Sequence, residues 1–336
     1  FFFAFQVLPT IIFFASLMSV FYYLGIMQKI VQGMAWVMAK VMGTSGAESL
    51  SCTANIFVGQ TEAPLMIKPF IKGMTQSELL TIMIGGMATI AGGVMAAYIQ
   101  MLGSAYATAH GIPLIGASVM AAPGAMMIGK ILIPETAESE TKGSVKVSIE
   151  KNSSNVIEAA ANGASDGLQL ALNVGAMLLA FIALIALINF LLNGFGDLVG
   201  LNSYLITNFG QPLSFQLMIG LVLQFVAYGI GVPWHDALTF GSLLGTKVVL
   251  NEFVAYSDMG NLVQTGKLVN EKSILMATYA LCGFANFSSI AIQIGGLGPL
   301  APNRKSDIAA LGIKAVIGGV LTTLLTATLA GLFFAF

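Results

Sequence analysis

The chain has 336 residues, of which 57% are hydrophobic and only 9% are charged, and its formal net charge is −1. A soluble protein needs about 25% charged residues to cover its surface, so this composition excludes a soluble globular protein and indicates one embedded in a lipid bilayer. The small net charge also excludes a basic surface for nucleic acid. Cys52 and Cys282 suggest neither a disulfide framework nor a zinc site, and the distance in sequence between His110 and His235 argues against a histidine metal centre.

The first half of the chain alternates apolar spans with polar interruptions. A bilayer core about 30 Å thick requires roughly 20 apolar residues in a helix. Residues 1–26 meet this requirement without a charge, whereas residues 27–42 mix Lys and Gln with apolar side chains and predict an amphipathic helix at the interface. Residues 79–102 and 112–133 are further candidate spans, and we expect Pro123 to interrupt the second.

The second half follows the plainly polar stretch 134–155, which predicts a solvated linker between two lobes. Apolar spans then occupy 168–192, 215–232 and 308–336. Two further apolar segments, 238–256 and 274–300, are interrupted by polar and small residues.

The two lobes share a pattern. Each contains a polar-broken segment with an acid, Glu62 or Glu252, followed by a helix rich in Gly, Ala and Ser. Matching broken segments in two halves are typical of secondary transporters, so we predict an all-α integral membrane protein with inverted repeats, two re-entrant helical hairpins and discontinuous transmembrane helices. The predicted units are a scaffold span with the interfacial helix (1–46), a first repeat with its hairpin tip at 59–63 and a broken helix (47–133), the polar linker (134–155), scaffold spans (156–232), a second repeat with breaks at 251–256 and 282–292 (233–303), and a C-terminal span (304–336).

The segment "ANIFVGQTEAPLMIKPF" predicts the first hairpin tip. Pro64 cannot continue a helical hydrogen-bond ladder, and Gly59 allows the chain to turn. Irregular backbone at membrane depth must face protein or a water-filled cavity. Gln60, Thr61 and Glu62 therefore indicate half of a binding site for a polar solute, because an ionisable group inside a membrane is costly and indicates a functional site.

Structural roles for these polar residues stay open at this level. Glu62 could pair with Lys68 or Lys247, and Glu252 could pair with Lys247. Four more residues could serve only as hydrogen-bonding groups between helices: Thr89, Asn286, Ser288 and Ser289.

Two other function classes are weighed against a transporter. A channel needs polar residues along the whole depth of several helices, but here they cluster at two tips and two matching helices. A membrane-embedded hydrolase using Glu62 and Glu252 lacks a nucleophile with a histidine partner or a metal-ligand set. We therefore expect no enzyme activity and no cofactor.

Three motifs, "NIFVGQTEAPL", "NEFVAY" and "CGFANFSSIAI", resemble the hallmark motifs of the bacterial branch of the concentrative nucleoside transporters. The resemblance implies sodium-coupled import of nucleosides such as uridine by an elevator-type alternating-access mechanism, in a homotrimer of the bacterial inner membrane. Members of that family usually carry extra N-terminal helices, so we expect the natural chain to begin before Phe1.

The resemblance also implies a site. The nucleobase falls on Gln60, Thr61, Glu62, Val94 and Leu170, and the ribose on Glu252, Phe284, Asn286 and Ser289. Sodium, a hard cation that prefers oxygen ligands, falls on Asn55, Val58, Thr89 and Ile90. The alternative is a proton-coupled symporter, in which a buried carboxylate such as Glu62 or Glu252 carries the proton.

Overall fold

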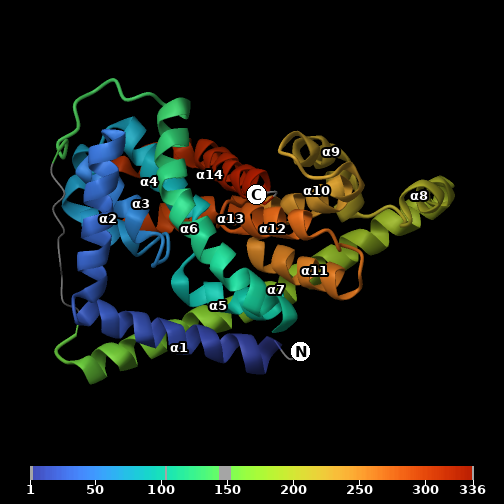
Figure 1. The fold of residues 1–336 in the computed structure, drawn as a ribbon, viewed down its shortest axis with the longest axis horizontal. Helices are drawn as coiled ribbons and strands as arrows, with labels where there is room; N and C mark the ends of the chain where they lie inside the picture. Colours follow the sequence, from blue (N-terminus) through green and yellow to red (C-terminus); the bar gives the residue numbers. More distant parts are fainter. Residues whose placement is uncertain (1–2, 103, 144–152, 335–336) are drawn as a thin grey trace.

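The computed structural model describes residues 3–102, 104–143 and 153–334. Apart from an isolated bridge between Ser45 and Lys142, the regular elements in these residues are helices (Figure 1). Residues 144–152 of the predicted linker, and the outermost ends of the first and last predicted units, lie outside the described residues. The elements are α1 (Phe3–Tyr23), α2 (Ile26–Met42), α3 (Gly46–Ala54), η1 (Ala63–Gly73), α4 (Gln76–Ala88), α5 (Gly92–Met101), α6 (Ser104–Leu132), α7 (Val156–Leu198), α8 (Leu201–Phe209), α9 (Phe215–Gly229), α10 (Trp234–Val249), α11 (Glu252–Gln264), α12 (Glu271–Leu281), α13 (Phe287–Leu297), η2 (Pro302–Arg304) and α14 (Lys305–Phe333).

Length and composition make several of these helices membrane spans. Within the described residues, four helical segments are long and apolar enough to cross a bilayer, and two bent helix pairs raise the number to six. The chain bends by 78° between α1 and α2 and by 119° between α9 and α10. These features are those of a multi-pass integral membrane protein.

The two halves repeat one order of elements. In the first half, the hairpin of α3 and η1 precedes α4 and α5, whose helix is broken at residues 89–91, and then comes α6. In the second half, α10 and α11 meet at residues 250–251, α12 and α13 are separated by residues 282–286, and α14 follows. The predicted all-α class, with re-entrant hairpins and discontinuous helices, is confirmed. The grouping of these elements into scaffold and transport units stays a prediction.

The first hairpin differs from its prediction in extent. The incoming helix already ends at Ala54, so the irregular turn covers residues 55–62 rather than 59–63. Pro64 stands in the first turn of the outgoing arm, where a missing N–H costs nothing. That arm is a 3₁₀ helix containing a second proline, Pro69, and it continues to Gly73.

The predicted interruption at Pro123 is wrong. Helix α6 continues from Ser104 to Leu132 with both Pro113 and Pro123 inside it. A proline removes one ladder hydrogen bond, and packing against neighbouring helices makes this tolerable within a membrane bundle. Gly124 is part of such a contact, because a Cβ there would lie 3.1 Å from Cγ2 of Thr322 in α14.

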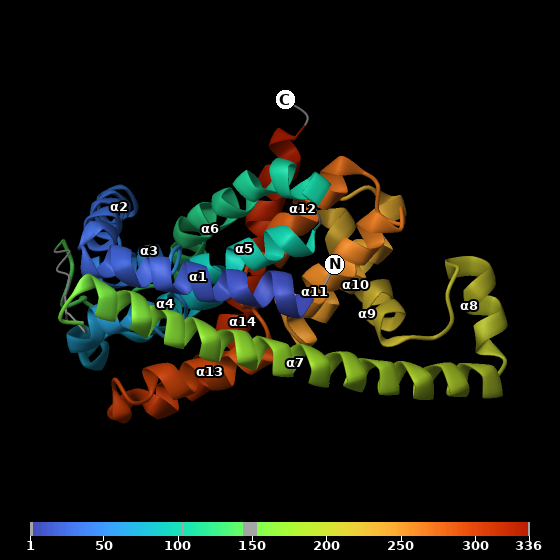
Figure 2. The same cartoon turned by 90° about the horizontal axis from the view of Figure 1, so that it is seen from below.

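Helix α7 is longer than the predicted span 168–192. It begins at Val156 because the side chain of Asn155 caps it, accepting a hydrogen bond from the N–H of Glu158. Near its start, Gly163 and Gly167 allow α1 to approach closely, since Cβ atoms there would lie 2.5 Å from Ser19 and 2.8 Å from Ala15. Its other end projects beyond the rest of the molecule and carries α8 (Figures 1 and 2).

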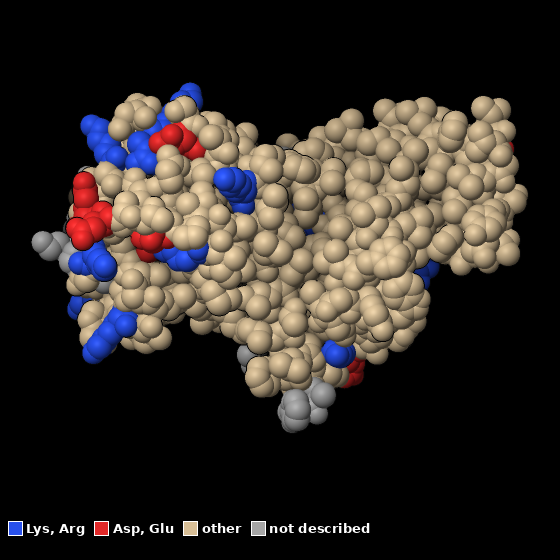
Figure 3. Space-filling view, turned by 90° about the horizontal axis from the view of Figure 1, so that it is seen from above, with Lys and Arg blue, Asp and Glu red and all other residues tan. Residues whose placement is uncertain are grey.

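Charged side chains are unevenly distributed. On the face in Figure 3, Lys, Arg, Asp and Glu gather at the end that contains α2, α3 and α4, while the opposite end around α8 and α9 is nearly free of them. Such a surface suits a protein that exposes most of its area to lipid.

Candidate functional site

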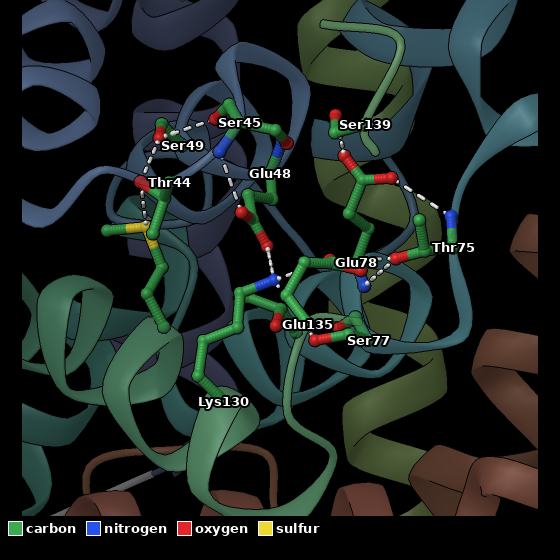
Figure 4. Close-up of polar contacts among 12 residues, drawn as sticks. Thr44, Ser45, Glu48, Ser49, Thr75, Ser77, Glu78, Lys130, Glu135 and Ser139 are labelled. Atoms are coloured by element: carbon green, nitrogen blue, oxygen red, sulfur yellow. Dashed lines mark hydrogen bonds and ion pairs between the residues drawn. The ribbon is translucent and has the colours of Figure 1, made fainter. Parts of the chain in front are cut away.

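The base of the first hairpin is fixed by a polar cluster (Figure 4). Ser45 caps α3 and exchanges hydrogen bonds with Glu48, whose second carboxylate oxygen lies 2.8 Å from Nζ of Lys130 in α6. Lys130 also donates to Oγ of Ser77 at 3.1 Å and to Oε2 of Glu135 at 3.1 Å. The cluster thus joins α3, α4 and α6 at the hairpin's foot.

Part of the predicted linker belongs to this cluster and is not solvated. Thr141 is buried, and its Oγ1 accepts a hydrogen bond from the N–H of Ala47 at 3.1 Å.

The same cluster shifts the pKa of Glu135. Burial raises this pKa, but hydrogen bonds from Thr75 and Lys130 outweigh the effect of burial, and the pKa is lowered overall. The carboxylate therefore stays ionised beside Lys130 at neutral pH.

The tip of the first hairpin contacts the break after α4, and that break contacts the one after α12. The carbonyl of Phe57 accepts from the N–H of Gly92 at 3.0 Å, and the carbonyl of Thr89 accepts from the N–H of Phe284 at 3.3 Å. A Cβ at Gly283 would lie 2.9 Å from two carbonyl oxygens of α4, so only glycine permits this approach of the two breaks. The irregular backbone of both halves therefore meets in one place, where each break satisfies groups of the other.

Two helix N-termini supply the second half of the site. Asn251 caps α11, which begins with Glu252, and Asn286 caps α13 by accepting from the N–H of Ser289 at 2.9 Å. Nδ2 of Asn286 donates to Oε2 of Glu252 at 3.2 Å, and the hydroxyl of Tyr98 donates to Oε1 at 2.9 Å. The carboxylate is only 3% exposed and sits at a helix N-terminus, where the helix dipole favours a negative charge.

Two further hydrogen bonds join the first hairpin to this half. Nε2 of Gln60 donates to Oγ of Ser289 at 3.3 Å, and Oε1 of Gln60 accepts from Nε2 of Gln293 at 3.2 Å. The predicted residues Gln60, Ser289, Asn286 and Glu252 therefore lie in one buried polar network that extends from the hairpin tip to α11.

Two members of this network, Tyr98 and Gln293, are absent from the sequence-based site. Each stands four residues after a predicted site residue on the same helix: Val94 precedes Tyr98 and Ser289 precedes Gln293. Residues four apart share a helix face, so this spacing is the signal that could have identified them.

The remaining predicted nucleobase residues, and Phe284 of the predicted ribose set, lie outside this network. Thr61 packs against α13, because a Cβ at Gly296 would lie 2.6 Å from its Cγ2. Val94 is buried in the core, and Phe284 packs against the same cluster. The carboxylate of Glu62 accepts from the N–H of Gly59 at 3.0 Å.

Glu62 lines a cavity of about 440 Å³ between the hairpin tip, α1 and the beginning of α7. Leu170, which is 37% exposed, and Val58 line it as well. Oε1 of Gln28 in α2 and the hydroxyl of Tyr22 in α1 are buried without a hydrogen-bond partner in the described part of the chain, and both residues belong to the cavity wall. Polar groups are therefore available on both sides of the tip.

The predicted sodium residues lie in neighbouring segments, because the Phe57–Gly92 hydrogen bond joins residues 55–58 to the break after α4. Asn55 is 1% exposed; its Nδ2 donates to the carbonyl of Ser51, while its Oδ1 is buried with no partner among the described residues. The hydroxyl of Thr89 donates to the carbonyl of Gly85, which leaves the lone pairs of its oxygen available. Ile90 is fully buried beside it. The side-chain oxygens of Asn55 and Thr89 are neutral donors of the kind that a hard cation accepts.

Ion pairing does not explain the acids of the two tips. No ion pair among the described residues includes Glu62, Glu252 or Lys247. Lys247 is fully buried but donates to the carbonyl of Ala280 and to Oγ1 of Thr323. Hydrogen bonds rather than a lysine therefore satisfy Glu252.

Comparison with known proteins decides the family. Residues 113–331, more than half of the chain, match the family model described as "Na+ dependent nucleoside transporter C-terminus", and residues 4–105 match one described as "Nucleoside recognition". The chain belongs to the concentrative nucleoside transporter family.

Individual relatives of this transporter support the same family assignment. The nucleoside permease NupC of Helicobacter pylori is 47% identical over 339 residues, covering 99% of this chain and 76% of that protein. The rat sodium/nucleoside cotransporter 1 is 43% identical over 345 residues, although the chain spans only 51% of its length. The solved structure of CNTnw in an inward-facing substrate-bound state has a TM-score of 0.89 and 46% identity, covering 100% of this chain and 76% of that one.

These comparisons confirm the predicted family and show that the relatives of this transporter are transporters, not enzymes. The same relative, CNTnw, has also been solved as a variant in an outward-facing state, with a TM-score of 0.89 to this chain.

Proposed function

We propose that this transporter imports nucleosides by binding them between the first hairpin tip and the N-termini of α11 and α13. The observation that supports this most strongly is the hydrogen bond from Gln60 to Ser289, which brings the predicted base-reading and ribose-holding residues into one network. Gln60, Thr61, Glu62, Val94 and Leu170 contact the nucleobase.

Ribose hydroxyls are held by Glu252, Asn286 and Ser289, with Phe284 alongside. A carboxylate accepts hydrogen bonds from hydroxyls, and an amide can both donate and accept. A sugar lacking one hydroxyl leaves a buried group unpaired at a cost of about 1–3 kcal/mol, which is the basis of selectivity.

We propose sodium as the coupled ion, bound by the side chains of Asn55 and Thr89 and by the carbonyls of Val58 and Ile90. The partnerless, buried Oδ1 of Asn55 supports this proposal, as does the sodium dependence in the family description. Binding there would order the turn that precedes Gln60, so ion and nucleoside would stabilise each other's sites.

We propose that the protein acts as a homotrimer in the bacterial inner membrane, with the two hairpins and broken helices moving as an elevator against a scaffold. The projecting half of α7 and the neighbouring α9 (Figure 2) support such a scaffold, because large apolar side chains on both helices are exposed. Phe190 is 75% exposed, Leu198 84%, Val222 70% and Phe225 65%. Partner subunits and lipid would cover this surface.

Uptake of labelled uridine into proteoliposomes containing the full-length protein tests the nucleoside assignment. We expect saturable uptake that unlabelled nucleosides compete away and that free nucleobases and ribose do not. Uptake that never saturates would indicate a channel, and absence of uptake would contradict the substrate assignment.

A further inference from the structure

The orientation of the Gln293 side chain is determined by its surroundings. Its Nε2 lies 2.9 Å from the carbonyl oxygen of Met83. A carbonyl can only accept, so the atom of Gln293 that faces it must be the amide nitrogen. The other atom, Oε1, is buried and has no partner among the described residues.

This orientation determines that of Gln60. The Gln293 nitrogen also faces Gln60 at 3.2 Å, so the Gln60 atom on that side must be its oxygen. The Gln60 nitrogen is thereby directed to Ser289, at 3.3 Å. An amide nitrogen bears two hydrogens, and Ser289 takes one of them. The other remains for a solute, and the tip offers it a donor rather than an acceptor.

Close packing holds the two amides in register. Gln293 is 1% exposed and Gln60 7%, and α4 passes beside both of them. A Cβ at Gly86 would lie 2.9 Å from Nε2 of Gln293 and 2.9 Å from Cβ of Gln60. Since no side chain intervenes at this position, the two amides can meet.

We propose that Gln293 is a positioning residue that fixes the polarity of the Gln60 amide, so that the hairpin tip presents an N–H group and favours a nucleobase with a carbonyl over one with an amino group on the edge it reads. The proposal rests on the proposed function, in which Gln60 contacts the nucleobase. Gln293 acts through Gln60 and need not touch the solute.

A comparison of uridine transport with cytidine transport tests this role, because cytidine carries an amino group where uridine carries a carbonyl. The KM values of both would be measured in proteoliposomes for the full-length parent and for Gln293→Glu and Gln293→Met. A carboxylate turns the nitrogen of Gln60 toward itself and its oxygen toward the site, while Met removes the constraint. Gln224→Met is the matched control, since the side-chain amide of Gln224 in α9 donates to the carbonyl of Leu221 within its own helix.

We expect Gln293→Glu to shift the ratio of the two KM values about tenfold toward cytidine. Gln293→Met would shift it in the same direction by less, and Gln224→Met would leave it unchanged. Comparing two nucleosides within one variant cancels differences in expression and in maximal rate. If Gln293→Glu does not fold, Gln293→Met decides the matter alone.

An unchanged ratio in a Gln293 variant that still transports would overturn the proposal while leaving the proposed function intact. Absence of saturable uptake of both nucleosides by the parent would overturn the proposed function, and this inference with it.

Discussion

Asn286 donates a hydrogen bond to Glu252 at 3.2 Å, so the residue that caps α13 holds the first residue of α11. Tyr98 of α5 occupies the other carboxylate oxygen. Asn286 and Glu252 are separated by 34 positions in the sequence, and their contact closes the ribose side of the proposed site. A ribose bound here must exchange hydrogen bonds with groups that already satisfy one another, which limits binding to solutes with correctly placed hydroxyls.

Replacement of Glu252 by Gln should weaken nucleoside binding. The amide cannot accept hydrogen bonds with both of its atoms, so one of the groups around it loses a partner at a cost of about 1–3 kcal/mol, or about 5- to 150-fold in KM. Uptake of uridine should suffer more than uptake of a deoxynucleoside. Glu158→Gln is the control, because Glu158 is an exposed acid in the first turn of α7. An equal loss for both substrates would contradict the ribose assignment.

Gly86→Ala should destabilise the transporter. Its Cβ would lie 2.9 Å from both Gln60 and Gln293, and such overpacking costs about 1–3 kcal/mol. Gly295→Ala in α13 meets open space and should be neutral or slightly stabilising, since Ala favours helix more than Gly does. Thermal unfolding of the two variants in detergent, followed by uptake assays, checks this difference. Equal melting temperatures would show that the Gln60–Gln293 contact is looser than described.

Asn55→Leu should abolish stabilisation by sodium. A ligand that binds only the folded protein raises the melting temperature as its concentration rises. We therefore expect the melting temperature of the parent to be higher in sodium chloride than in choline chloride. The melting temperature of the variant should be the same in both salts. Asn208→Leu is a matched control, because both amides donate to a carbonyl four residues earlier. A sodium effect that survives Asn55→Leu would place the ion elsewhere.

Lys130→Met should loosen the foot of the first hairpin. It leaves the carboxylate of Glu48, only 2% exposed, without a counter-charge, and losing one partner of a buried pair costs about 3–5 kcal/mol. Adding Glu48→Gln should recover part of the loss in thermal stability.

The same cluster predicts that the stability of the folded transporter depends on pH. Because its folded pKa is lowered, Glu135 stabilises the folded state above the ordinary carboxyl range, and this contribution is lost as the pH falls through the lowered value. Lys130→Met should therefore make the melting temperature less sensitive to acid than that of the parent. Identical acid profiles would rule out this role of Glu135.

The sequence predicts the breaks in the helices well, because glycine, proline and polar residues at membrane depth have few other uses. It misjudges Pro123, since the tolerance of a proline depends on neighbouring helices that a single sequence does not reveal. The early start of α7 at Val156 has a recognisable signal, the N-cap Asn155, that hydropathy does not register.

The polar network is harder to predict. The contact between Gln60 and Ser289 joins residues 229 positions apart, and the family motifs alone suggest it. Tyr98 and Gln293 each stand four residues after a predicted site residue, and this spacing indicates a shared helix face but not the hydrogen-bond partner. Their roles follow only from the fold, which brings α5 to α11 and the first hairpin to α13.

Uridine uptake driven by imposed gradients tests the central claim most directly. Proteoliposomes with the full-length protein would be given an inward sodium gradient or an inward proton gradient, side by side. We predict saturable uptake above equilibrium with sodium alone, and loss of this accumulation in Asn55→Leu. Accumulation driven by protons alone would contradict sodium coupling and shift attention to Glu62 and Glu252 as proton carriers.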